Sequence, residues 1–354
     1  KAFRIWYLLS LDDDPQGKFG MGLLYKNGFD QLDPSCEYAL QYLASAEKSG
    51  INDASYELGN IFEIGKLCKI DKNKALTYYT KAANNNHLES IIRLAESYEN
   101  GTLGPKDQNK SCAYSDQAAN LGDAIGQYRS AKCYKYKLAG TRDFDKAINL
   151  LETAINQKID ISNDAKLELV NSDELNDNEL SCEWNEKLHK KNYIEGTYET
   201  ALCLKYNKAG QKDFDKAINY LTLAKDTYGE DELFKVNFQT EEINCDWYQI
   251  LHQNNYSEAT YNFAMCYRYG KGRAENLEEA RKLFEELMEG EKTSDQEGKL
   301  ELSDMCLEGI GGNKDMALAE VLLLSIRDGS NSTDRQKALK LESDQDALKS
   351  ELRA

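Results

Sequence analysis

The strongest constraint on the fold of this chain is a pattern that repeats every 36 residues. Ala39, Ala75, Ser111 and Ala147 are each 36 positions apart, and a bulky residue follows each of them. A second series of small residues keeps step with the first and consists of Gly22, Gly59, Ala95, Ala131, Ala201, Ala264 and Ser303. A period of this length is typical of stacked helix pairs, each of which needs a neighbour to bury its apolar face.

Residues 51–86 contain one complete unit of this pattern. Apolar residues from Ala54 to Phe62 fall at helical spacing, and Gly65 ends that helix. A second amphipathic stretch begins near Asp71. Gly59 is expected at a close crossing of the two helices, because a residue without a side chain lets the neighbouring helix approach. The unit therefore predicts a helix, a loop and an antiparallel second helix.

About nine such units follow one another along the chain, some of them degenerate. They predict an all-α fold, an α/α superhelical solenoid of antiparallel helix pairs over residues 1–330. Lys1-Ala2 matches the start of a second helix such as Lys74-Ala75, so the chain is expected to begin mid-repeat, either because upstream sequence was removed or because it is a designed fragment. Residues 331–354 are highly charged and predict a polar capping helix, since the last repeat of a solenoid needs a soluble outer face.

These units resemble the Sel-one-like repeat (SLR) family, a branch of the tetratricopeptide-type helical repeats. The resemblance rests on Ala54-x-Tyr56-x-Leu58-Gly59-x-x-Phe62-x-x-Gly65, on Lys74-Ala75-x-x-Tyr78-Tyr79-x-x-Ala82-Ala83, and on the glycine loops at 267–272 and 309–312. It implies an α/α superhelix whose concave groove binds a protein partner. It brings with it no catalytic residue and no cofactor.

Charge and composition exclude several other classes of function. The net charge of −17 disfavours nucleic acid and anionic membranes as partners, because both require Lys and Arg to neutralise phosphates. No run of 18 apolar residues occurs, so we expect no membrane insertion. Three histidines and the absence of zinc-type ligand spacings or phosphate-binding glycine loops predict neither a metal site nor an enzyme. The chain alone is expected to be a monomer.

Nine cysteines allow three interpretations. Cys112 and Cys133 lie 21 residues apart, and the same spacing separates Cys182 from Cys203 and Cys245 from Cys266. The cysteines could be reduced core residues, disulfides or metal ligands. We favour reduced cysteines, because buried free Cys behaves as a small hydrophobe. This interpretation predicts a soluble protein in a reducing compartment, either the cytoplasm or, for a secreted effector, the host cytosol.

Two units, near residues 158–192 and 226–255, are irregular and acidic. Both lack a clear small residue in the first helix, and both carry Asp and Glu in large excess over Lys. Runs of this kind are usually solvated faces. A basic partner is the alternative.

A short motif, Cys-x-basic-Tyr, recurs at the end of three first helices and suggests a binding surface. The basic residue and the Tyr are expected to point away from the helix-pair interface, next to the residue four positions before each Tyr. The nine candidate protein-binding residues are Lys132, Lys135, Tyr136, Leu202, Lys205, Tyr206, Met265, Arg268 and Tyr269. The alternative is that each Tyr only seals the loop of the next repeat.

Three functions fit these observations to different degrees. We favour a non-enzymatic scaffold, adaptor or regulator of a partner protein, such as a bacterial host-interaction effector or a regulator of one. The second hypothesis is a eukaryotic repeat subunit of a membrane-associated complex of the degradation or chitin-synthase type. An enzyme built on a repeat scaffold is the least favoured, since no set of residues meets the geometric needs of an active site.

Overall fold

The protein is described here from a computed structural model, which covers residues 2–29, 32–158, 160–235, 240–289 and 296–329. These residues form helices joined by loops, and the only β-type pairing among them is an isolated bridge between Phe29 and Leu32. The predicted all-α fold is confirmed. The chain divides into two compact units, the first ending at Asp177 and the second beginning at Asn178.

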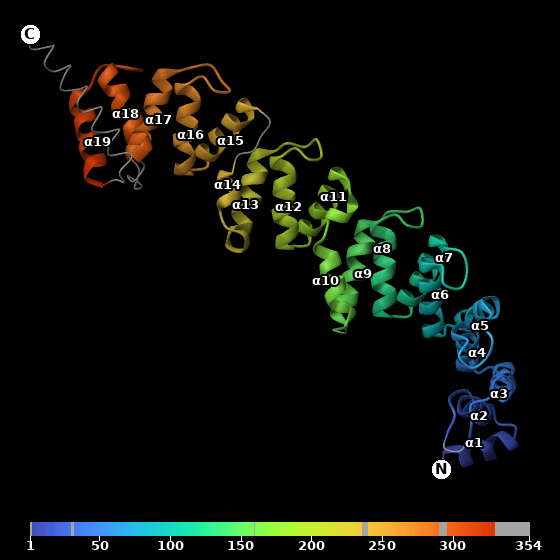
Figure 1. Cartoon of the computed structure of the whole chain (residues 1–354). Helices are drawn as coiled ribbons and strands as arrows, with labels where there is room; N and C mark the ends of the chain where they lie inside the picture. The colour runs from blue at the N-terminus through green and yellow to red at the C-terminus, as the bar shows by residue number, and fades with distance from the viewer. Residues whose placement is uncertain (1, 30–31, 159, 236–239, 290–295, 330–354) are drawn as a thin grey trace, which may run out of the picture. The chain divides into compact units, whose positions relative to one another are not determined.

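The first unit stacks helix pairs from α1 to α10 (Figure 1). Its elements are α1 Ala2–Leu11, α2 Pro15–Asn27, α3 Cys36–Lys48, α4 Asn52–Ile64, α5 Lys72–Asn84, α6 Leu88–Asn100, α7 Gln108–Asn120, α8 Ala124–Lys135, α9 Phe144–Asn156, α10 Ile161–Val170 and the 3₁₀ turn η1 Asp173–Leu175. Helices α2, α4, α6, α8 and α10 are the first helices of successive repeats, and the helix that follows each regular one packs antiparallel to it.

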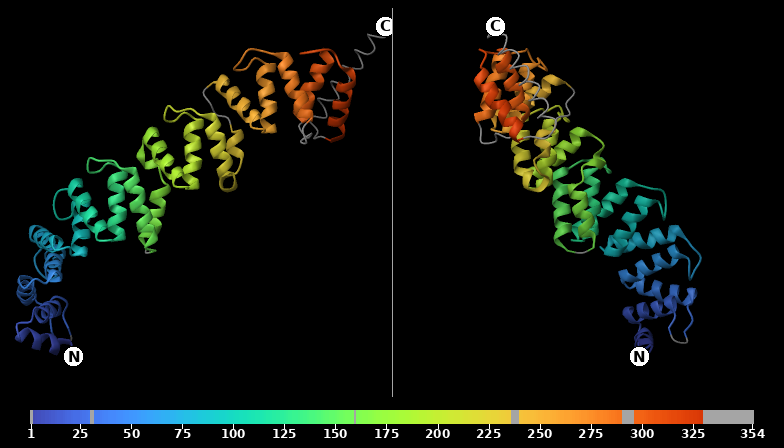
Figure 2. Two further views of the ribbon diagram at one scale, coloured as in Figure 1. Left: turned by 180° about the vertical axis from the view of Figure 1, so that it is seen from behind. Right: turned by 60° about the vertical axis from the view of Figure 1, so that its left-hand side comes forward.

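The second unit repeats the arrangement with one shortened first helix, and Figure 2 shows its helices from two further sides. Its elements are α11 Asn178–Lys190, α12 Ile194–Lys205, α13 Phe214–Tyr228, α14 Asp231–Phe234, α15 Glu241–Gln253, α16 Ser257–Arg268, α17 Leu277–Glu289, α18 Gln296–Glu308 and α19 Met316–Gly329. The capping helix predicted for residues 331–354 lies outside the described residues.

Residues 51–86 fold as the sequence predicts, into the helix pair α4 and α5. Ala54 and Leu58 of α4 are fully buried, as are Ala75 and Ala82 of α5. Gly59 lies at the crossing, where an added Cβ would be 2.7 Å from Cε1 of Tyr79. The predicted close approach at this glycine is confirmed.

The ends of these helices follow ordinary capping chemistry. The side chain of Asp71 accepts a hydrogen bond from the backbone N–H of Lys74 and so begins α5. Gly65 ends α4 in the left-handed conformation at φ 67°, and Gly101 does the same for α6 at φ 75°. The repeat therefore specifies its helix boundaries as well as its packing faces.

The prediction that all cysteines are reduced is wrong. Eight of the nine form disulfides, which join Cys36 to Cys68, Cys112 to Cys133, Cys182 to Cys203 and Cys245 to Cys266. Cys306 is free and buried. The three pairs with 21-residue spacing each join a second helix to the first helix of the next repeat, where the two facing positions are close enough for a bond. The regular 21-residue spacing in the sequence therefore indicated disulfides.

The two acidic stretches are structurally irregular. In the first, α10 and η1 replace a regular first helix, and in the second α14 has only four residues. Regular helices follow in both cases, α11 and α15, and Trp184 and Trp247 on them are fully buried. Both tryptophans therefore pack in the core.

Candidate protein-interaction surface

Ion pairs connect the first helices of neighbouring repeats in the first unit. Lys26 of α2 pairs with Glu57 of α4. Nε of Arg93 on α6 lies 3.0 Å from Oε2 of Glu63 on α4. Arg129 of α8 then reaches back to α6, where it pairs with Glu99 and, at 2.9 Å, with Glu96. The first helices therefore present a row of mutually neutralised, half-buried charges.

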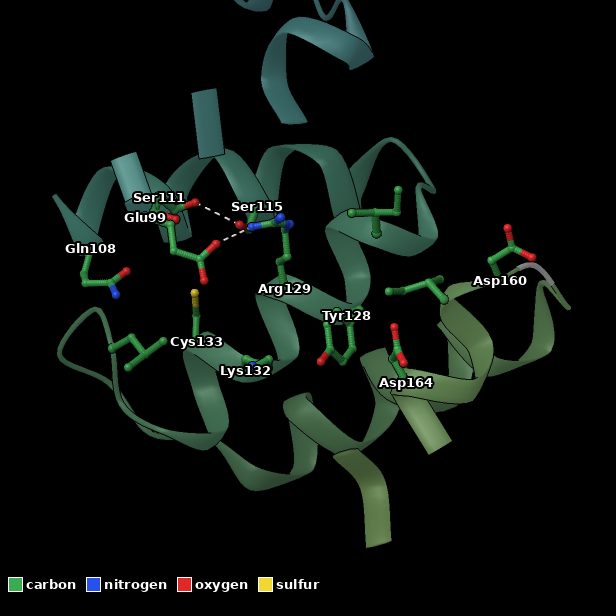
Figure 3. A pocket seen from close by; sticks show the side chains of 13 residues that line it. Glu99, Gln108, Ser111, Ser115, Tyr128, Arg129, Lys132, Cys133, Asp160 and Asp164 are labelled. Carbon is green, nitrogen blue, oxygen red and sulfur yellow. Dashed lines mark hydrogen bonds and ion pairs between the residues drawn. The ribbon is translucent and has the colours of Figure 1, made fainter. Parts of the chain in front are cut away.

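A hollow of about 480 Å³ lies beside α8, next to this row of ion pairs. Figure 3 shows the side chains around it, which come mainly from α7, α8 and α10. Its apolar lining consists of Ile125, Tyr128, Leu138 and Ile161. A concave, largely apolar site with a few polar groups is the usual form of a binding pocket.

Charges of opposite sign lie on different sides of this hollow. Asp160 and Asp164 come from the start of α10, and both are exposed. Lys132 of α8 lies opposite, with its ammonium 5.6 Å from the centre of the Tyr128 ring. Arg129 also lines the hollow, but it is already paired with Glu99. Burial raises the pKa of the Tyr128 phenol above its ordinary value.

The hollow lies where the regular repeat ends. Regular first helices such as α4 and α6 have 13 residues, whereas α10 has ten. Helix α10 packs mainly against α9 and makes fewer contacts with α8. Helix α10 and the residue before it supply Asp160, Ile161 and Asp164 to one side of the hollow.

Two of the nine predicted binding residues are buried, contrary to expectation. Lys135 is 0% exposed and Lys205 is 1% exposed, so neither points away from the helix-pair interface. The ammonium of Lys135 donates to the Glu168 carbonyl at 2.6 Å and to the Glu168 carboxylate at 2.8 Å. Lys205 bonds in the same way to Glu232 and also to the carbonyl of Lys235 at 2.7 Å.

The reason for this burial is that short helices leave carbonyl groups without partners. The last turns of α10 and α14 cannot satisfy all their carbonyls, and a buried ammonium supplies the missing donors. Burial lowers the pKa of Lys135, while the hydrogen bond to Glu168 opposes that shift. Glu168 and Glu232 are therefore internal partners of these lysines rather than parts of a solvated face.

The two adjacent tyrosines belong to the same clusters. The hydroxyl of Tyr136 donates to Glu168 and lies 3.1 Å from a carboxylate oxygen of Glu174. The hydroxyl of Tyr206 donates to Glu232 at 2.5 Å. Burial, reinforced by these carboxylates, raises the pKa of both phenols. Both rings are half-buried, and their hydroxyls contact carboxylates on the short helices α10 and α14 of the next repeat.

The third copy of the motif is more open. Arg268 pairs with Glu301 at 2.7 Å and with Asp304, both on the next first helix, α18. Tyr269 is 49% exposed, and its hydroxyl lies 3.2 Å from Glu301. Leu202 and Met265 are half-buried and pack against the cores of their own repeats. Lys132 is the one member of the predicted set that lines the hollow beside α8.

Sequence reasoning did not identify the hollow or its other lining residues. The signal that was available is the irregular start of the 158–192 unit, which marks where regular packing stops. A role in binding remains a prediction for all nine residues of the motif set.

The described part of the chain has neither a cluster of metal ligands nor a helix that could span a membrane. No three His, Cys, Asp or Glu side chains within it are grouped so as to hold a metal ion. None of its helices is both long enough and apolar enough to cross a membrane.

Two solved bacterial proteins are similar to this chain in structure. One is c5321, described as a protective antigen of uropathogenic Escherichia coli strains with an SLR fold; it is 17% identical, with 97% of this chain and 78% of that one covered and a TM-score of 0.43. The other is a Sel1 repeat protein from Oxalobacter formigenes, 19% identical, with 96% and 89% covered and a TM-score of 0.41. Both TM-scores lie below 0.5, so neither carries an argument about this chain.

Family models give a clearer result. No curated protein matches the sequence. The Sel1 repeat model matches six segments, at residues 15–51, 52–87, 88–123, 124–158, 195–226 and 257–287. Most of each irregular acidic stretch falls between matches. The matched segments cover more than half of the sequence, and they coincide with the regular helix pairs described above. The chain therefore belongs to the Sel1 repeat family, whose members generally act as protein-interaction scaffolds.

Proposed function

We propose that this chain is a non-enzymatic scaffold or adaptor that binds a segment of a partner protein in the hollow beside α8. The observation that carries the proposal is the combination of an apolar lining with charges of opposite sign at its edges. An apolar anchor in a pocket supplies affinity, and complementary charges set the orientation of the bound chain.

The chemistry of the hollow specifies the partner segment. An apolar or aromatic side chain fits against Tyr128 and Ile161. A Lys or Arg beside it would meet Asp160 and Asp164, and an acidic residue further along would meet Lys132. We therefore expect an extended or helical segment that carries both signs of charge around an apolar centre.

We also propose that the protein acts in an oxidising compartment. Four disulfides among the described residues support this, because disulfides persist where thiols are not continuously reduced. This proposal replaces the reducing compartment expected from the sequence.

Site-specific photo-crosslinking tests the proposed binding site. A photoreactive phenylalanine analogue replaces Tyr128 in one variant and Leu121, which is 45% exposed and does not line the hollow, in a matched control. In the native cell extract, the variant at 128 should crosslink to one segment of one partner, and the control should not. A further charge reversal, Asp164→Lys, should abolish the crosslink. Equal crosslinking from both positions, or insensitivity to the charge reversal, would contradict the proposal.

A further inference from the structure

Stacked aromatic pairs recur between the first and second helices of the early repeats. In each pair, one ring belongs to a residue near the end of the first helix, and the other belongs to a residue on the second helix. The pairs are Tyr25 with Tyr42, at 5.7 Å and 12°, Phe62 with Tyr78, at 6.0 Å and 3°, and Tyr98 with Tyr114, at 5.9 Å and 5°.

In two of these pairs, a lysine twelve positions later lies over the first ring. The ammonium of Lys74 is 5.0 Å from the ring centre of Phe62, and that of Lys110 is 5.0 Å from Tyr98. The next repeat keeps this contact, with Lys146 at 4.0 Å from the ring of Tyr134. The Lys-over-ring contact is thus a regular part of the repeat, and it is of the cation–π type.

The Tyr134 hydroxyl has two further partners in that repeat. It accepts a hydrogen bond from Lys146 at 2.6 Å and donates one to Asp116 at 2.8 Å. Asp116 lies on α7, four positions after Cys112, and it also accepts from the hydroxyl of Ser130. A phenol ring therefore fills this space, held by one cation and one carboxylate.

The equivalent place in the second unit lacks the phenol. Residues 143–149 and 213–219 have the same sequence, Asp-Phe-Asp-Lys-Ala-Ile-Asn, which fixes the correspondence at an offset of 70. Leu204 therefore stands where Tyr134 stands, and Lys216 corresponds to Lys146. The second-helix ring is present as Tyr220, but its stacking partner is missing.

A hollow of about 240 Å³ lies at this place. Its lining includes Leu204, Ala209, Lys216 and Tyr220, together with Glu186 of α11. The ring of Tyr220 is held against the imidazole of His189, at 4.2 Å between centres.

The polar side chains that line this second hollow form hydrogen bonds and ion pairs with other partners. Glu186, four positions after Cys182, corresponds to Asp116 and pairs with the exposed Lys190 at 2.7 Å. Thr200 corresponds to Ser130, but its hydroxyl donates to the carbonyl of Gly196 at 2.6 Å. Lys216 lies 3.3 Å from Asp213, and the two side chains are 64% and 35% exposed. Glu186 and Lys216 are thus held by solvent-accessible pairs, which are weak and easily exchanged.

We propose that this hollow receives a tyrosine side chain from a partner protein. The incoming ring would stack on Tyr220, under the ammonium of Lys216, as the intramolecular rings do in the earlier repeats. Its hydroxyl would donate to Glu186 and accept from Lys216, as Tyr134 does with Asp116 and Lys146. This site is in the second unit and is independent of the hollow beside α8, so it extends the proposed function rather than resting on it.

The test uses N-acetyl-L-tyrosinamide as the probe and methyl NMR of the full chain as the measurement. The Ala209 methyl should shift saturably with the tyrosine probe, and much less with N-acetyl-L-leucinamide. Leu204→Tyr should fill the hollow from within and weaken probe binding at least tenfold. The same variant should melt at or above the temperature of the parent. Leu204→Phe provides a second filled variant if Leu204→Tyr does not fold.

The reciprocal substitution in the first unit is the matched control. Leu150 stands where Tyr220 stands, so the control combines Tyr134→Leu with Leu150→Tyr. This double variant removes the internal phenol, supplies the stacking ring and should create a new probe site, seen as a saturable shift of Ala139, the equivalent of Ala209. Equal binding of the two probes to the parent chain would overturn the proposal. Undiminished tyrosinamide binding to the filled variants would overturn it as well.

Discussion

At position 59 the backbone of α4 lies against the ring of Tyr79, and this contact shows how single residues set the spacing of the helices. The hydroxyl of Tyr79 reaches past the glycine and donates to Glu63 at 2.8 Å. Glu63 is in turn paired with Arg93 of the next repeat. A residue without a side chain thus allows one aromatic ring to connect two repeats.

Replacing Gly59 with Leu should overpack this crossing and lower the free energy of unfolding by about 1–3 kcal/mol or more. Thermal denaturation measures the loss. Gly104→Leu is the control, because a Cβ there meets nothing within 4 Å and the change should cost less than about 0.5 kcal/mol. Equal melting temperatures for the two variants would show that the crossing is not tight.

Removing the ammonium of Lys135 is a second test at this scale. Lys135→Met leaves the carbonyls of Glu168 and Asn171 without that donor and the Glu168 carboxylate without its cation. Breaking a buried pair in this way costs about 3–5 kcal/mol. The control is Lys137→Met at an exposed position, which should be nearly neutral. A Lys135→Met variant that unfolds at the same denaturant concentration as the parent would contradict the assignment.

At the scale of elements, the sequence predicts the regular helix pairs well and the irregular ones poorly. Small residues at fixed spacing determine where α4 to α9 approach one another, and that spacing is visible in the sequence. The short helices α10 and α14 instead end at carbonyl groups that Lys135 and Lys205 satisfy from the preceding repeat, which is a tertiary effect. The Cys-x-basic-Tyr motif identified these lysines but could not indicate which way they point.

The disulfides were missed for a related reason. A buried Cys and a bonded Cys occupy the same kind of apolar position, so the pattern of apolar residues does not distinguish them. The 21-residue spacing does distinguish them, because it places one Cys on a second helix and the other at the facing position of the next first helix.

These bonds predict a measurable contribution to stability. The Cys112→Ala, Cys133→Ala double variant should lose about 2–4 kcal/mol, as expected for closing a loop of this length. Hydrogen exchange should increase first in α7 and α8, since repeat proteins respond locally. Alkylation of the unreduced, denatured parent should modify one thiol, that of Cys306. Nine modified thiols would contradict the disulfide assignment.

At the scale of the whole molecule, the excess of negative charge is distributed between internal and accessible sites. Glu63, Glu96 and Glu99 are paired with arginines of neighbouring repeats. Asp160 and Asp164 are exposed beside an apolar hollow. Of the binding residues predicted from the sequence, Lys132 lies there, because its position on α8 follows from helical periodicity alone. The rest of the hollow is lined by side chains from α7, α8 and α10, which only tertiary packing brings together.

The central claim is that the hollow beside α8 binds a segment of a partner protein, and calorimetric titration of that segment tests it most directly. Tyr128→Ala removes the aromatic anchor, and Leu121→Ala changes an exposed residue of the same unit outside the hollow. Tyr128→Ala should weaken binding by about 2 kcal/mol or more, as expected for an interface hot spot. Leu121→Ala should leave the affinity unchanged. An unchanged affinity for Tyr128→Ala, with the variant shown to be folded, would contradict the claim.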